Sequence, residues 1–185
     1  MSSPSPVPPV QLHIYPAKVL RQKAKPIDKF TDELRQVIAR MFEVMDVEEG
    51  IGLAAPQVGI SLRLFILDVP ENAKRGSLAT SIPPSASPGR MVFINPVLRF
   101  EGPVEPMDEG CLSLPEITGE VLRPPIVHVT ALDEFGKPFT LTAGGLLSRC
   151  IQHETDHLDG VLIIDKMTQP SRVKNRIAVK KLEND

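Results

Sequence analysis

The chain has 185 residues, of which 42% are hydrophobic and 24% charged, and its formal net charge is −2 at pH 7. This length and composition predict one compact domain with its own core and exclude an intrinsically disordered protein. The nearly balanced charge gives no general attraction for nucleic acid or an anionic membrane, so we expect neither as a partner. Two cysteines cannot build a disulfide scaffold, which favours a reducing compartment.

Residues 1–10 are rich in proline. Proline fixes the backbone and removes a hydrogen-bond donor, so we expect an extended, disordered arm here. The arm lacks the basic start and apolar core of a signal peptide, and no apolar run in the chain approaches the roughly 18 residues of a membrane span. We therefore expect a cytoplasmic protein.

Beyond this arm, the first half of the chain predicts one helix and two strands. Between residues 28 and 49, apolar side chains recur at helical spacing and predict an amphipathic helix. Residues 62–69 and 91–98 are short apolar runs with turn signals on either side, which is typical of buried strands. The polar, proline-containing residues 71–90 between them predict a long surface loop.

The second half predicts a hairpin followed by two helices. Residues 126–132 and 138–142 flank a polar turn, which predicts paired strands. Residues 144–158 have helical periodicity, with Gly160 placed to end the helix, and residues 171–182 predict a short polar helix. Since strands and helices do not alternate regularly, we expect a single α+β domain with mixed or antiparallel strands and not a doubly wound sheet.

The pattern His-Glu-x-x-His at residues 153–157 lies on the predicted helix 144–158. Its two histidines are about 40° apart around the helix axis and one turn apart along it, so both imidazoles can bind one ion. Glu154 then faces the water bound to that ion. Two surface histidines on an ordinary helix are the alternative, but the strong helical context favours a metal site at the centre of the fold.

A catalytic metal needs a third protein ligand and an open position for water. Ile163 stands where a metzincin protease would carry its third histidine, which excludes that class. Cys150 lies seven residues before His157, about 10 Å along the helix axis, so we expect it to be a packed small hydrophobe. Cys111 follows Gly110 in a predicted tight turn and is the better candidate, with a buried structural cysteine as the alternative.

Residues 50–59 are rich in glycine and alanine, which lets a backbone come close to a ligand. Gln57 within them can aim its amide at a developing oxyanion. A close-packed connection between a helix and a strand is the alternative interpretation of such a segment.

Together, residues 50–59, 109–113 and 152–157 resemble the three signature motifs of peptide deformylases, in the same order and with similar spacing. The resemblance extends from about residue 13 to residue 167. It implies a monomeric hydrolase that removes the formyl group from the N-terminal formyl-methionine of nascent, ribosome-associated polypeptides and releases formate. We accordingly expect a catalytic domain over residues 11–170 and a C-terminal helix or tail over residues 171–185.

The resemblance also assigns roles in the reaction. It implies that one divalent metal ion has a hydroxide in its fourth position, that Glu154 is the general acid and base, and that Gln57 and the Leu112 N–H stabilise the oxyanion. The implied metal ligands are Cys111, His153 and His157.

Further residues are implied to bind substrate or to support the ligands. The substrate main chain is expected at Ile51 and Gly110, and Gly52 is also expected to bind substrate. The methionine pocket is expected to be lined by Ile51, Met107, Leu146 and Cys150.

The pair Glu109 and Arg123 resembles an ion pair that braces the Cys111 turn. Two positions depart from the family pattern. Thr118 stands where some relatives carry arginine in the substrate groove. Arg149 replaces an apolar residue beside the pocket, and we expect it to face solvent.

The identity of the metal is not decided by the sequence. The softness of the ligands favours zinc, whereas the resemblance implies ferrous iron in the cell, with zinc, nickel or cobalt possible in the purified protein. Two other interpretations stay open at this point: a general zinc endopeptidase, and a module in which the ion serves only folding.

Overall fold

The computed structural model describes residues 10–69, 81–82 and 89–184. The arm predicted at residues 1–10 and most of the loop predicted at 71–90 lie outside these ranges. Among the described residues, no helix is both long enough and apolar enough to cross a bilayer.

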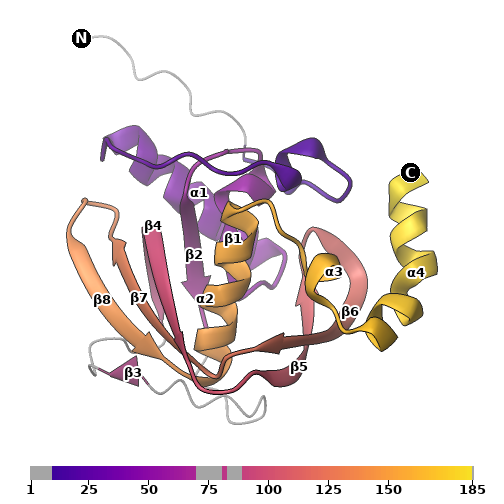
Figure 1. The fold of residues 1–185 in the computed structure, drawn as a ribbon. Coiled ribbons are helices and arrows are strands. Elements are labelled where there is room, and N and C mark those ends of the chain that lie inside the picture. The colour runs from indigo at the N-terminus through magenta and orange to yellow at the C-terminus, as the bar shows by residue number, and fades with distance from the viewer. Residues whose placement is uncertain (1–9, 70–80, 83–88, 185) are drawn as a thin grey trace.

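Most of the described strands form one antiparallel sheet (Figure 1). Its strand order is β1-β2-β4-β7-β8-β3. In chain order these strands are β1 (Gly52–Ala54), β2 (Leu64–Asp68), β3 (Ser81–Ile82), β4 (Arg90–Glu101), β7 (Ile126–Leu132) and β8 (Pro138–Ala143). The predicted strands at 62–69 and 91–98 and the predicted hairpin at 126–142 are thereby confirmed.

A second, two-stranded sheet pairs β5 (Glu105–Cys111) with β6 (Leu114–Arg123). The sequence predicts only a turn near residues 109–113, and this turn occurs at Leu112 and Ser113 between the two strands. The register shifts between Gly110 and Cys111, so Cys111 lies at an irregularity where the ladder ends. Such irregularities redirect side chains beside functional sites.

Four α-helices complete the described chain: α1 (Asp32–Val47), α2 (Gly145–Leu158), α3 (Ile163–Lys166) and α4 (Gln169–Asn184). Helix α1 begins after Thr31, whose hydroxyl accepts a hydrogen bond from the Leu34 N–H at 3.3 Å, and this cap explains why it is shorter than the range 28–49. Helix α2 matches its prediction, and Gly160 just beyond it has a left-handed φ of 72°.

The six-stranded sheet is covered by helices on both faces at β2. Its residues Leu64 and Ile66 face α1, in a hydrophobic cluster with Ile38 and Met41. The alternate residues on β2 face α2 in a separate cluster, which we call the α2 cluster. Because side chains alternate across a strand, a fully buried strand separates two cores.

The α2 cluster holds the helix against the sheet. Leu147, Ile151 and Leu158 of α2 pack there with Phe65 and Phe93. The rings of Phe65 and Phe93 stack, with their centroids 4.7 Å apart.

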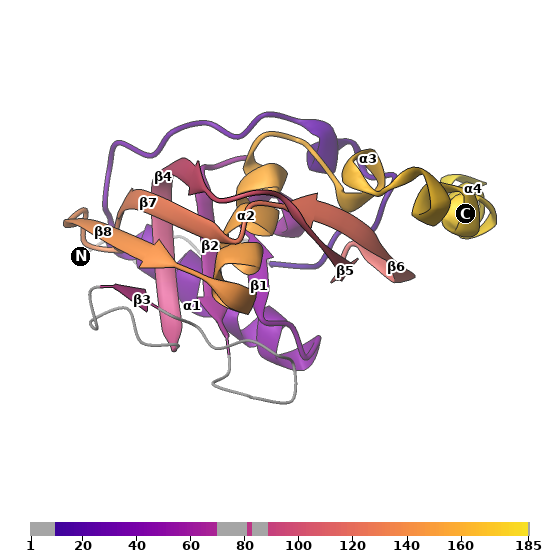
Figure 2. The same cartoon turned by 60° about the horizontal axis from the view of Figure 1, so that its bottom comes forward.

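A third core, here the hairpin cluster, lies at the other side of the molecule. It joins Ile117 and Val121 of β6 to Leu20 of the 3₁₀ helix η1 (Lys18–Arg21) and to Ile163 of α3, with Cys111 packed against it. Figure 2 shows α2 between the six-stranded sheet and the β5–β6 hairpin, with α4 beyond the hairpin. The fold is therefore α+β with a central helix, as predicted.

Candidate active site

The three predicted metal ligands come together from two elements. Cys111 ends β5, whereas His153 and His157 lie one turn apart on α2. The Nε2 atom of His157 lies 3.3 Å from Cys111 Sγ and 3.3 Å from His153 Nε2. All three ligand atoms lie within 4.8 Å of one another, so they fit a single ion that accepts sulfur and nitrogen ligands.

The carboxylate of Glu109 supports the three predicted ligands through a contact with His153. Its Oε2 lies 3.1 Å from His153 Nδ1, which leaves Nε2 of the same ring directed at the ligand cluster. Arg123 binds the carboxylate through two N–H groups, with Nε 2.5 Å from Oε1 and Nη2 2.8 Å from Oε2. Burial alone would raise the pKa of Glu109, but hydrogen bonds from Arg123 and His153 hold it well below its usual range.

Arg123 also links the β5–β6 hairpin to α2, the helix that carries His153 and His157. Its Nη1 donates to Asp156 Oδ2 at 2.8 Å, and Asp156 in turn pairs with Lys166 at 2.9 Å. The predicted pairing of Glu109 with Arg123 is thus present, and Asp156 extends it onto α2.

The structure contradicts the expectation that Arg149 faces solvent. Its side chain is buried, and Nη1 lies 3.1 Å from Glu109 Oε1. Helical spacing carried the missing signal, because Arg149 precedes His153 by four residues and therefore lies on the same face of α2.

Glu154 is buried beside the ligands. Its Oε2 forms no hydrogen bond with any described residue, and burial raises its pKa to about 7. Gly52 packs directly against it, since a Cβ atom at that position would lie 2.5 Å from Glu154 Oε1 and 2.8 Å from Cys150 Sγ. The glycine is therefore required by a close approach between β1 and α2.

The side-chain amide of Gln57 is held in one orientation. Gln57 belongs to the 3₁₀ helix η2 (Ala55–Val58), and its Oε1 accepts from the Ala54 N–H at 2.8 Å. Its Nε2 donates to Ser113 Oγ at 3.2 Å and lies 3.7 Å from Cys111 Sγ. Ser113 is fully buried, and the sequence did not single it out.

A cavity of about 530 Å³ opens beside these groups. All residues predicted to bind substrate line this cavity. Its lining also includes Gln57, Leu112, Thr118 and Arg149. The residues predicted to bind substrate are Ile51, Gly52, Met107, Gly110, Leu146 and Cys150. Cys150 lines the cavity and lies outside the ligand cluster, and burial raises the pKa of its thiol.

Three side chains that could hold one metal ion, a buried glutamate beside them and an adjoining cleft are typical of a metal-dependent hydrolase of the His-Glu-x-x-His class. Comparisons with known proteins identify the family. Residues 9–173 match the family model described as polypeptide deformylase. Peptide deformylase of Picosynechococcus sp. is 46% identical over 174 residues, which are 93% of this chain and 83% of that protein.

Solved structures agree with this match. A peptide deformylase from Synechococcus elongatus in complex with actinonin superposes with a TM-score of 0.80 at 44% identity, covering 94% of this chain and 88% of that one. A Plasmodium falciparum peptide deformylase gives a TM-score of 0.83 at 35% identity, covering 95% and 96%.

The chain therefore belongs to the peptide deformylase family. It is a hydrolase that removes the formyl group from the N-terminal formyl-methionine of nascent polypeptides. The family decides between the deformylase and endopeptidase interpretations in favour of the first.

Proposed function

We propose a division of the deformylation reaction among the residues of this cleft. Cys111, His153 and His157 hold one divalent metal ion, and Glu154 moves the proton. The observation that carries this proposal is the convergence of the three ligand atoms within 4.8 Å of one another, beside a buried carboxylate. When bound there, such an ion polarises the substrate carbonyl and lowers the pKa of water to about 7.

Glu154 is suited to accept and return a proton. Its pKa of about 7 makes both protonation states available near neutral pH. It takes one proton from the attacking water as the new C–O bond forms. It returns that proton to the amine nitrogen as the C–N bond breaks, so that formate and a free amino terminus are released.

Gln57 and Leu112 stabilise the oxyanion that develops on the formyl oxygen. The bond from the Ala54 N–H fixes the amide oxygen of Gln57, which leaves its NH₂ group directed to the Cys111 side of the cleft. The Leu112 N–H follows Cys111 directly at the turn and supplies the second donor. Loss of one such donor typically costs about 10²–10³ in rate.

The same cleft accommodates the substrate. Ile51, Gly52 and Gly110 contact its main chain. The methionine side chain is thioether-containing and apolar, and it suits an apolar pocket. That pocket is lined by Ile51, Met107, Leu146 and Cys150.

The proposed metal and cellular setting rest on membership of the deformylase family. We propose ferrous iron as the native metal, with zinc, nickel or cobalt able to replace it, and a monomer acting in the cytoplasm on chains that emerge from the ribosome. Iron and a thiolate ligand are both sensitive to oxidation. Protein prepared without oxygen should therefore keep a higher specific activity than aerobic protein, and equal activities would contradict native iron.

Substitutions test the assignment of the ligands and the base. Cys111→Ser should abolish tight metal binding, whereas Cys150→Ala should retain stoichiometric metal. Glu154→Ala should keep the metal and the fold but lose hydrolysis. Metal analysis and formate assays measure these outcomes, and metal retention in Cys111→Ser with loss in Cys150→Ala would refute the assignment.

A further inference from the structure

The proposed metal ligands belong to two units with separate hydrophobic cores. The histidines lie on α2, which packs through Leu147 and Ile151 in the α2 cluster. Cys111 lies on the β5–β6 hairpin, which packs through Val121 in the hairpin cluster. Figure 1 shows α2 between the six-stranded sheet and the hairpin. Apolar packing therefore holds each unit together, but the spacing between the units depends on the contacts that cross from one to the other.

Arg149 makes the widest of these crossing contacts. It starts on α2, and its guanidinium reaches both strands of the hairpin. Nη2 donates to the carbonyl oxygen of Glu105 on β5 at 2.6 Å, and Nη1 donates to the carbonyl oxygen of Val121 on β6 at 2.9 Å. The contact of Nη1 with Glu109 Oε1 adds a third point on the hairpin.

These contacts are costly to lose because Arg149 is buried, with 7% of its surface exposed. A planar guanidinium presents several N–H groups in a fixed fork, so it resists relative movement of the groups that it joins. A side chain with one point of attachment has no such effect.

Arg149 and Arg123 both bind the carboxylate of Glu109, the first from α2 and the second from the hairpin. Arg123 starts on the hairpin and reaches Asp156 on α2, whereas Arg149 starts on α2 and reaches the hairpin. Both bind Oε1 of Glu109, and its Oε2 contacts Arg123 and the ring of His153. The crossing contacts thus converge on the carboxylate next to one of the proposed ligands.

We propose that Arg149 is a positioning residue that sets the separation between Cys111 and the two histidines by clamping α2 to the β5–β6 hairpin. This inference rests on the proposed metal ligands, and it assigns a task to a residue that the proposed reaction does not use. It predicts that removal of the guanidinium weakens the metal site before it unfolds the protein.

The test compares Arg149→Met and Arg149→Lys with a matched control, Arg63→Met. Arg63 also anchors α2, since its Nη1 donates to Asp159 Oδ1 at 2.7 Å just beyond the end of the helix, but its contacts do not involve the hairpin. Each variant is titrated with Co²⁺ against a competing chelator. The absorption spectrum of the Co²⁺ protein then reports the geometry of the thiolate and imidazole ligands.

Supporting residues of a metal site typically change affinity by about 10–100-fold. We expect Arg149→Met to weaken Co²⁺ binding by a factor in this range and to alter the Co²⁺ spectrum. Arg149→Lys keeps the charge but loses the fork, and it should show an intermediate loss. Arg63→Met should lower the thermal midpoint while leaving both the affinity and the spectrum unchanged.

Wild-type affinity and spectrum in both Arg149 variants would overturn the inference, and so would an equal loss of affinity in Arg63→Met. Should Arg149→Met fail to fold, Arg149→Lys decides alone. Failure of the wild-type protein to bind Co²⁺ would instead overturn the proposed ligand set, so the two failures are distinguishable.

Discussion

At the residue scale, the contact between Gly52 and Glu154 is the tightest constraint in the site. Any side chain at position 52 would meet the Glu154 carboxylate at 2.5 Å and the Cys150 sulfur at 2.8 Å. Distances this short require that one partner moves. The glutamate is the side chain that the proposed reaction needs in place.

Gly52→Ala should therefore reduce kcat by about 10²–10⁴, the contribution that a positioned general base makes. Metal content should stay stoichiometric, because the atoms nearest a Cβ at position 52 belong to Glu154 and Cys150 and not to a proposed metal ligand. Steady-state kinetics and metal analysis measure the two effects. Gly89→Ala is the control, since a Cβ atom there meets no atom of the described residues within 4 Å. An unchanged kcat in Gly52→Ala would show that the displaced carboxylate is not required.

Ser113 offers a second prediction at this scale, because it holds the Gln57 amide from its donor end. Ser113→Ala should lower kcat about tenfold and leave KM nearly unchanged, a smaller loss than removal of an oxyanion donor outright. Ser148→Ala is a matched control, since Ser148 is equally buried and accepts from the Gln152 amide at 3.1 Å. Equal effects of the two substitutions on kcat would show that Ser113 has no role in the oxyanion site.

At the scale of elements, α2 and the β5–β6 hairpin differ in how far the sequence predicts them. Helix α2 has a regular apolar period and a terminal glycine, so local signals define it fully. The hairpin carries Pro106, several acidic residues and no clean alternation, so only its turn is predicted. Its strands depend on pairing and on the hairpin cluster, which are tertiary effects.

The site shows the same division. Helical spacing predicted the pairing of His153 and His157 beside Glu154, whereas the roles of Cys111, Gln57 and Leu112 came from the resemblance of the three motifs. The prediction for Arg149 was wrong because it compared the residue with an apolar position in relatives. Helical spacing places Arg149 on the same face of α2 as His153, but its partners Glu105 and Val121 come close only through the tertiary fold.

Helix α4 provides a prediction for the C-terminal element. Buried Asn175 donates to the Thr118 carbonyl at 2.8 Å and to the Ser171 carbonyl at 2.9 Å. Asn175→Ala should lower the free energy of unfolding by about 1–3 kcal/mol, because it removes two hydrogen bonds that a buried side chain donates. Urea unfolding measures this loss. Ile177→Ala, at a position that is 84% exposed, should change it by less than about 0.5 kcal/mol. Equal losses of unfolding free energy in the two variants would show that the Asn175 contacts do not hold α4 on the fold.

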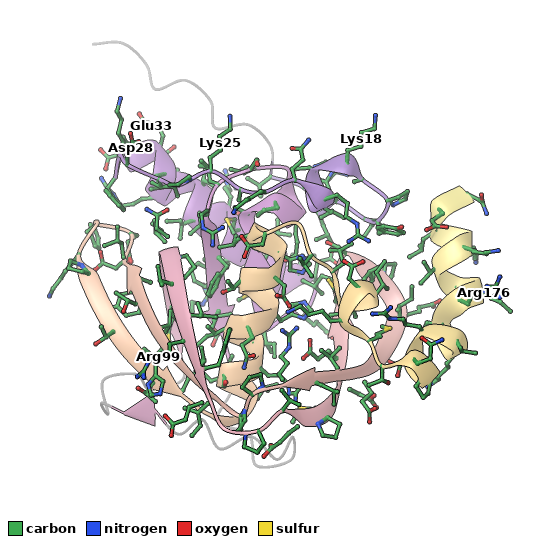
Figure 3. The ribbon with its side chains drawn as sticks, viewed as in Figure 1. Lys18, Lys25, Asp28, Glu33, Arg99 and Arg176 are labelled. Atoms are coloured by element: carbon green, nitrogen blue, oxygen red, sulfur yellow. The ribbon has the colours of Figure 1, made fainter. Side chains whose placement is uncertain are left out.

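At the scale of the whole molecule, the proposed metal site joins two separately packed units, and charged side chains lie at the periphery of the molecule. The side chains labelled in Figure 3, such as Lys18 on η1 and Arg176 on α4, are exposed at the periphery. The crossing contacts at Glu109 lie inside, next to His153. The metal is therefore expected to stabilise the arrangement of the units as well as to support the reaction.

Removal of the metal should lower the thermal midpoint. An ion present at 1,000 times its Kd adds about 4 kcal/mol to the free energy of unfolding. Calorimetry of the chelated and reloaded protein measures this shift, and Cys111→Ser should show the lower midpoint with or without added metal. Identical midpoints for the chelated and loaded wild type would contradict a folding contribution from the ion.

The most direct test of the central claim is formate release from formyl-Met-Ala-Ser, measured together with metal content on freshly prepared protein. The account predicts one formate for each peptide consumed, loss of this activity on chelation, recovery when the metal is restored, and no activity in Glu154→Ala. Cleavage of an internal peptide bond in an N-terminally blocked peptide, without formate release, would contradict it.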